Sequence, residues 1–178
     1  DDAGNSSQAT FPSVATDADG IFYDSQNDIV VQLNRSANVV NSYNDVLSNL
    51  TAMVTPSVAV TSTSDFANGR ELAVSNGQIV VAQDADPVNM DVNQFVVYDY
   101  TPTAITLNKT ITTNINLWGI TFGGDNLIAI VDNSADVAIF NDFLNIPAGN
   151  ATPDRTITIA DMIRTHGVTY DVDNDVMI

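Results

Sequence analysis

The stretch GVTYDVDNDVMI, Gly167 to Ile178, decides the fold because the chain contains related copies of it. It aligns without a gap to GIFYDSQNDIVV (20–31), and with one residue deleted to GITFGGDNLIAI (119–130). A degenerate fourth copy reads ELAVSNGQIVV (71–81). The first apolar residues of the copies recur after 51, 48 and 48 residues; they are Ile21, Leu72, Ile120 and Val168. This spacing indicates an internal repeat of about 48 to 50 residues.

Each repeat predicts four short β-strands. Runs rich in Val, Ile, Thr and aromatic residues alternate with turns of Asn, Asp, Gly and Pro. A third run ending in an aromatic residue follows each opening pair, and a fourth run leads into the next copy. Four-stranded units at this period predict an all-β chain with the β-propeller fold, in which each unit is one blade. We expect blades at about 20–62, 71–112 and 119–159, a half blade at 167–178, and a helix only within 42–53.

The third repeat also carries a resemblance to known proteins. Residues 128–158 read IAIVDNSADVAIFNDFLNIPAGNATPDRTIT, and THGVTYDVDND follows them closely. This pattern resembles the repeats of NHL-type and YVTN-type propellers, where an Asp-Asn turn, an apolar strand and a Pro-bearing loop precede a Gly-hydrophobic start of the next blade. The resemblance covers residues 11–178 and implies a fold more than an activity. Residues 11–16 (FPSVAT) would form the outer strand of a preceding blade. Since three and a half blades do not close a ring, we expect a partial propeller from a longer protein.

Composition excludes several partners. The 178 residues include 21 Asp but one Glu, one Lys and four Arg, and the formal net charge is −17. Such a charge repels nucleic acid and anionic lipid head groups, so neither is an expected partner. The sequence has no Cys, and therefore no disulfide or thiol chemistry.

The first ten residues, DDAGNSSQAT, are small and polar and are expected to form a flexible tether. An acidic start of this kind resembles exported lipoproteins of Bacteroidota just after their lipidated cysteine. The resemblance implies a protein at the cell surface or anchored to the outer membrane, with the periplasm as the alternative. Membrane attachment would then depend on a lipid anchor outside the given residues, and the expected partner is a protein, with outer-membrane proteins favoured.

Four residues share one position of the repeat, immediately before the first strand of each copy. They are Asp19, Arg70, Trp118 and His166. In the propellers that this chain resembles, this position faces the central opening on one side of the ring, where ligands commonly bind. The four side chains are therefore expected to share one rim, with Trp118 able to stack on a ring and His166 able to bind metal or act as a base. Packed and hydrogen-bonded loop residues are the alternative.

The acidic run at the end of the sequence allows two interpretations. Asp171, Asp173 and Asp175 match the first three ligand positions of a calcium loop. Val176 occupies the position at which such a loop needs Gly, and the equivalent segments of the other repeats have turn compositions. A tight turn between two strands is the favoured interpretation, and a Ca²⁺ site is the alternative.

Together these features predict a non-enzymatic, surface-exposed scaffold for protein–protein interaction, in which an accessory role in an outer-membrane complex is favoured. The sequence contains no nucleophile elbow and no paired-histidine metal motif, and no cofactor is expected apart from Ca²⁺ under the calcium alternative. One alternative is a module that binds a glycan or peptide at the central rim. The other is a metal-dependent hydrolase of the propeller lactonase type, but Asp19 alone does not establish the set of metal ligands that such an enzyme needs.

Overall fold

The computed structural model describes residues 18–48, 57–61, 64–85, 92–160 and 166–178. The predicted tether (1–10) and the predicted strand at 11–16 lie outside these residues. The described part consists of β-strands and a single short 3₁₀ helix, η1 (Phe143–Asn145). The helix expected within 42–53 is wrong over residues 42–48, because 42–44 end a strand and 45–48 form a bend and turn, and its remaining residues 49–53 lie outside the described part. No helix in the described residues has the length and apolar character needed to cross a bilayer.

Three sheets of antiparallel strands follow one another along the chain, each with its strands in sequence order from one edge. The first contains β1 (Ala18–Asp24), β2 (Ile29–Asn34), β3 (Val39–Asn44) and β4 (Val58–Thr61). The second contains β5 (Gly69–Ser75), β6 (Gln78–Gln83), β7 (Gln94–Thr101) and β8 (Ala104–Thr113). The third contains β9 (Leu117–Gly123), β10 (Asn126–Val131), β11 (Asp136–Phe140) and β13 (Arg155–Thr158). A two-stranded sheet of β14 (Tyr170–Asp171) and β15 (Val176–Met177) follows them.

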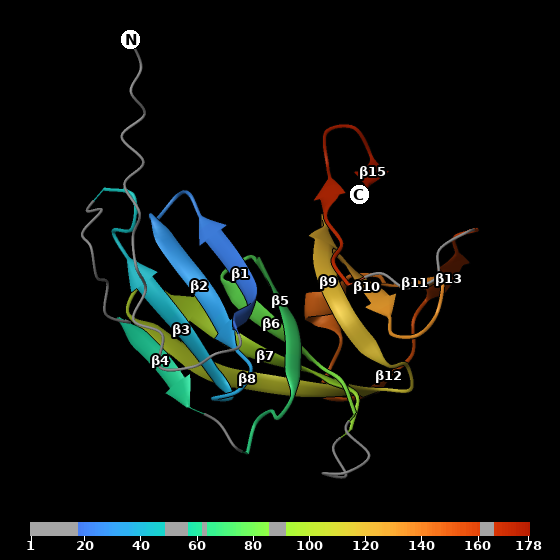
Figure 1. Ribbon diagram of the computed structural model, residues 1–178, viewed down its shortest axis with the longest axis horizontal. Helices are drawn as coiled ribbons and strands as arrows, with labels where there is room; N and C mark the ends of the chain where they lie inside the picture. Colours follow the sequence, from blue (N-terminus) through green and yellow to red (C-terminus); the bar gives the residue numbers. More distant parts are fainter. Residues whose placement is uncertain (1–17, 49–56, 62–63, 86–91, 161–165) are drawn as a thin grey trace.

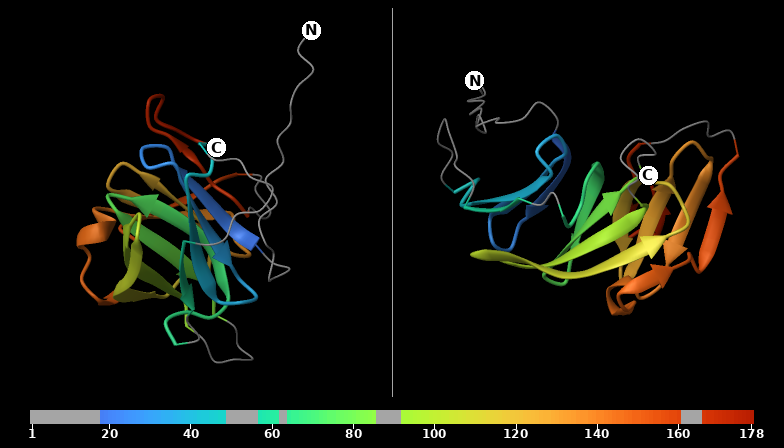
Figure 2. Two further views of the ribbon diagram at one scale, coloured as in Figure 1. Left: turned by 90° about the vertical axis from the view of Figure 1, so that its left-hand side faces the viewer. Right: turned by 90° about the horizontal axis from the view of Figure 1, so that it is seen from below.

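The three sheets stand side by side along an arc, as blades do around a propeller axis (Figures 1 and 2). The first strand of each sheet lies on the concave side, and β5 contacts both β1 and β9. The residues at the start of the first strand of each blade therefore lie at equivalent places on the concave side of the arc. We refer to the sheets as blades 1, 2 and 3.

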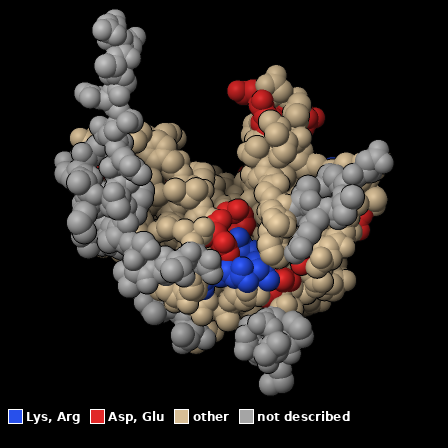
Figure 3. Space-filling view, in the orientation of Figure 1, with Lys and Arg blue, Asp and Glu red and all other residues tan. Residues whose placement is uncertain are grey.

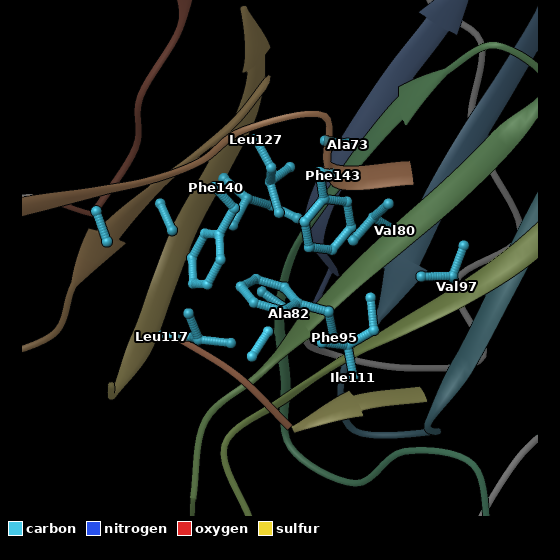
Figure 4. Packing of buried hydrophobic residues seen from close by; sticks show 14 residues of the cluster. Ala73, Val80, Ala82, Phe95, Val97, Ile111, Leu117, Leu127, Phe140 and Phe143 are labelled. Carbon is cyan, nitrogen blue, oxygen red and sulfur yellow. The ribbon is translucent and has the colours of Figure 1, made fainter. Parts of the chain in front are cut away.

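Apolar packing between neighbouring blades holds the arc together. One buried cluster joins blades 1 and 2 and includes Leu33, Leu72 and Tyr98. A second joins blades 2 and 3, where the ring of Phe95 meets the edges of Phe140 and Phe143 (Figure 4). An aromatic residue on the third strand of each blade is almost fully buried; these residues are Tyr43, Tyr98 and Phe140.

Blade 3 also reaches back to blade 2. The segment between β11 and β13 contains η1 and β12 (Gly149–Ala151), and β12 pairs in parallel with the outer strand β8. From β8, Lys109 Nζ donates hydrogen bonds to the carbonyls of Leu144 (2.5 Å) and Ile146 (2.7 Å) in the same segment. Blade 2 is thus a five-stranded sheet whose outermost strand comes from the next repeat.

Candidate functional site

The four residues that share one position of the repeat line a single pocket of about 320 Å³. Asp19, Arg70 and Trp118 come from β1, β5 and β9, and His166 precedes the fourth copy of the repeat. Arg35, Glu71 and Gly167 complete the lining. Figure 3 shows acidic and basic residues side by side in the hollow at the middle of this face. We call this hollow the rim pocket.

Backbone irregularities place the first three side chains there. In β1 the pairing with β2 shifts between Ala18 and Gly20, so Asp19 is an extra residue. In β5 the same shift between Gly69 and Glu71 makes Arg70 extra, and in β9 the pairing is irregular opposite 129–131, next to Trp118. A β-bulge re-aims a side chain and increases the local twist. The repeat therefore carries a bulge at each rim position on these strands.

The rim side chains stack on one another. The Arg70 guanidinium carbon lies 4.3 Å from the centroid of the Trp118 ring, within the range of a cation–π interaction. The imidazole of His166 stacks on the same indole, with ring centroids 4.7 Å apart and an angle of 30° between the planes. His166 is exposed and Trp118 is half-buried. Arg70, Trp118 and His166 thus form one stacked group in the lining of the pocket.

Both arginines of the pocket already have carboxylate partners. Arg70 Nη2 donates to Asp84 Oδ2 at 3.1 Å, and these two side chains are only 12% and 9% exposed. Burial raises the pKa of Asp84, and the hydrogen bond and charge of Arg70 oppose that shift. Arg35 Nη1 lies 3.5 Å from Asp19 Oδ2, and its Nε and Nη2 both donate to Asn68 Oδ1 at 3.1 and 2.8 Å.

Glu71 and Arg35 also line the pocket, and the sequence did not identify either of them as a site residue. Three of the four repeats have Gly in the position of Glu71; these are Gly20, Gly119 and Gly167. A Cβ atom on Gly20 would lie 2.5 Å from Glu71 Oε1, so the glycine of blade 1 makes room for the carboxyl of blade 2. Burial raises the pKa of Glu71 to about 7; a backbone hydrogen bond from Leu72 opposes the shift and the Asp19 charge adds to it. The sequence offered one signal for this residue, because Glu71 is charged at a repeat position where the other three copies have Gly.

The acidic run at 171–175 forms a turn, as the favoured interpretation holds. Asp171 Oδ1 accepts hydrogen bonds from the backbone N–H groups of Asp173 and Asn174, at 3.1 and 3.2 Å, and Tyr170 O–H donates to Asp175. The turn at Asp24 in blade 1 has the same bonds, including one from a tyrosine to the last Asp. Throughout the described residues no three His, Asp or Glu side chains come together as metal ligands would. The carboxylates of Asp171 and Asp175 therefore accept hydrogen bonds within the turn, and the calcium alternative stays a prediction.

Comparison with known proteins supports the fold. No family model matches the chain, and no curated protein matches it. Several solved structures do: the glutaminyl cyclase of Myxococcus xanthus aligns with a TM-score of 0.59 at 11% identity, covering 90% of this chain and 66% of that one. The nidogen/laminin complex aligns with a TM-score of 0.60 at 12% identity, covering 87% and 52%. The β-propeller domain of Cps50 (Swd1) from Myceliophteria thermophila aligns with a TM-score of 0.52 at 11% identity, covering 91% and 51%.

These similarities confirm the predicted all-β fold with four-stranded, propeller-like blades. The chain spans about half to two thirds of the length of the proteins that it matches. At such low identity the likeness concerns the fold alone, and the closer resemblance to NHL-type and YVTN-type repeats stays a prediction.

Proposed function

We propose that this protein is a non-enzymatic binding module that receives its ligand in the rim pocket. One observation carries the proposal: side chains from equivalent positions of all four repeat copies meet around a single hollow. A β-propeller is commonly a binding scaffold, and a concave pocket with a few convergent polar groups is the usual form of a binding site. The exposed imidazole of His166, which stacks on Trp118, suits a sugar ring or a planar peptide side chain.

The hydrogen bonds of the pocket support a preformed binding surface. Arg70 and Arg35 are held by Asp84, Asp19 and Asn68, so their positions are fixed before a ligand arrives. Preorganised polar groups lower the entropy cost of binding. The pocket also lacks a nucleophilic Ser or Cys among its lining residues. These features support a rigid recognition surface, and the non-enzymatic character is part of the proposal.

The expected place of action and partner class are proposals that rest on sequence. The acidic composition and the lipoprotein-like start support a protein at the cell surface or in the periplasm, bound to a protein partner such as an outer-membrane protein. Protease treatment of intact host cells tests the location. Loss of the full-length protein supports the cell surface, whereas protection until the outer membrane is opened supports the periplasm.

An array of immobilised glycans and peptides tests the rim pocket. The wild-type protein is compared with His166→Ala and Asp19→Asn, and with Asp125→Asn as a control for a carboxylate in an exposed turn away from the rim. We expect a ligand that binds the wild type and the control but binds both rim variants at least about tenfold more weakly. If both rim variants bind every ligand as the wild type does, the pocket is not the binding site.

A further inference from the structure

A second hollow continues from the rim pocket along the concave side of the arc. It has a volume of about 310 Å³ and lies between the inner strands β1, β5 and β9 and residues 168–169. Most of its lining residues are apolar, although polar atoms make up the larger part of the exposed lining; the apolar residues that are not fully buried include Ile21, Phe122 and Val168. Ile21 is 68% exposed although it belongs to an inner strand, because it faces this hollow. We call it the inner channel.

Glu71 lies where the two hollows meet, since it is the residue that lines both. Its Oε1 accepts one hydrogen bond, 3.0 Å from its neighbour Leu72 N. Among the described residues it has no cationic partner, because Arg35 pairs with Asp19 and Arg70 pairs with Asp84. Glu71 is therefore a mostly buried carboxyl group that has no positive charge paired with it in the site.

The surroundings of Glu71 favour a positively charged ligand group over an anion. The charged and titratable groups at the rim are Asp19 on β1, Arg35 after β2, Arg70 on β5, and the imidazole of His166. The two arginines are neutralised by their carboxylates, and the chain as a whole carries a formal charge of −17. This field attracts cations and repels anions.

We propose that the rim pocket and the inner channel form one site for a small primary amine with an apolar body. The ammonium group donates hydrogen bonds to the Glu71 carboxylate, and the apolar body lies against Ile21, Phe122 and Val168. A primary ammonium fits because it is compact and has three N–H donors, whereas a quaternary ammonium has none. The proposal rests on the proposed function, since it assigns a ligand class to the same site.

The only tryptophan of the chain, Trp118, lies in the rim pocket, so its fluorescence reports on occupancy. Hexylamine and hexanol differ only in the head group, hexanoate carries a carboxylate on an alkyl chain one CH2 shorter, and methylamine has the amine head group without the body. Each compound is titrated into the full chain. We expect hexylamine to bind about ten- to a hundredfold more tightly than hexanol, as a charged hydrogen bond requires. Hexanoate and methylamine should bind more weakly than hexylamine.

The decisive variant is Glu71→Gln, which keeps the shape and removes the charge, with Asp125→Asn as the matched control. In Glu71→Gln, hexylamine should bind no more tightly than hexanol, while in the control it keeps its advantage. A second readout is pH: the wild-type affinity for hexylamine should rise through about pH 7 as Glu71 loses its proton, and this rise should be absent in Glu71→Gln. Far-UV circular dichroism of both variants verifies that the fold is intact.

Two results would overturn the assignment: equal binding of hexylamine and hexanol by the wild type, or unchanged hexylamine binding in Glu71→Gln. The proposed function of the rim pocket is tested independently of the amine site. If hexylamine does not bind but an array ligand depends on His166, the amine proposal fails and the proposed function stands. If hexylamine binding depends on Glu71 while His166→Ala and Asp19→Asn affect no array ligand, the amine site stands and the wider role of the rim fails.

Discussion

Replacement of Phe95 by alanine should loosen the contact between blades 2 and 3. Phe95 is fully buried on β7, and its ring centroid lies 5.0 Å from that of Phe143 and 5.2 Å from that of Phe140, both in edge-to-face geometry (Figure 4). Truncation of a buried Phe to Ala costs about 3 to 5 kcal/mol, because it leaves a cavity as well as losing apolar burial. For a chain of this length we expect the melting temperature to fall by roughly 8 to 16 °C.

Urea unfolding followed by circular dichroism measures the loss. The midpoint should fall while the slope stays the same, since the surface exposed on unfolding hardly changes. Leu107→Ala on β8 is the control; its side chain is 49% exposed, and we expect a loss below about 1 kcal/mol. A double-mutant cycle of Phe95→Ala with Phe143→Ala should give a coupling of about 0.5 to 1.5 kcal/mol. If Phe95→Ala costs less than about 1.5 kcal/mol, the two blades are not packed around this ring.

Three further predictions concern the rim. Because burial holds the pKa of Glu71 at about 7, above its ordinary 4.5, the folded state binds more protons between these values. The free energy of unfolding should therefore fall as pH rises from about 4.5 to about 7, by up to about 3 kcal/mol, and urea titrations of Glu71→Gln should lack this decrease. Arg70→Met leaves the buried Asp84 without its cation and should cost about 3 kcal/mol, whereas Arg35→Met, at a partly exposed pair, should cost under about 1 kcal/mol; equal losses in chemical denaturation would refute the difference. Gly119→Ala should lower the melting temperature, because the new Cβ would lie 2.6 Å from the backbone carbonyl oxygen of His166; an unchanged melting curve and unchanged Trp fluorescence would contradict this contact.

The repeat allowed much of the fold to be predicted because equivalent residues of a propeller occupy equivalent places around the axis. The alignment of Gly167–Ile178 with its other copies predicted the first two strands of each blade, and it identified the column of residues that lines the rim pocket. The bulge that turns Asp19 and Arg70 toward the pocket leaves no mark in hydrophobic periodicity, because one extra residue is easily taken for a variation in turn length.

Other features depend on contacts between repeats, which periodicity within a repeat does not report. The strand β12 is three residues long, GNA, and has no alternating apolar pattern; it becomes a strand by pairing with β8. The importance of Glu71 likewise depends on the space left by Gly20 in another blade. The calcium alternative stays a prediction, and the structure shows that the Asp171 carboxylate accepts hydrogen bonds from the backbone N–H groups of its own turn.

The parallel strand β12 limits how this propeller can evolve. Blades of a repeat protein are readily duplicated, deleted or exchanged when each one contacts its neighbours only through side chains. Here the outer edge of blade 2 is completed by backbone hydrogen bonds from the repeat that follows, and Lys109 donates two more hydrogen bonds to the same segment. A recombination event between these two repeats would leave β8 without its partner in one product and β12 without its partner in the other. Repeats 2 and 3 should therefore be inherited as a pair, whereas a cut before Gly69 separates blades that share no sheet.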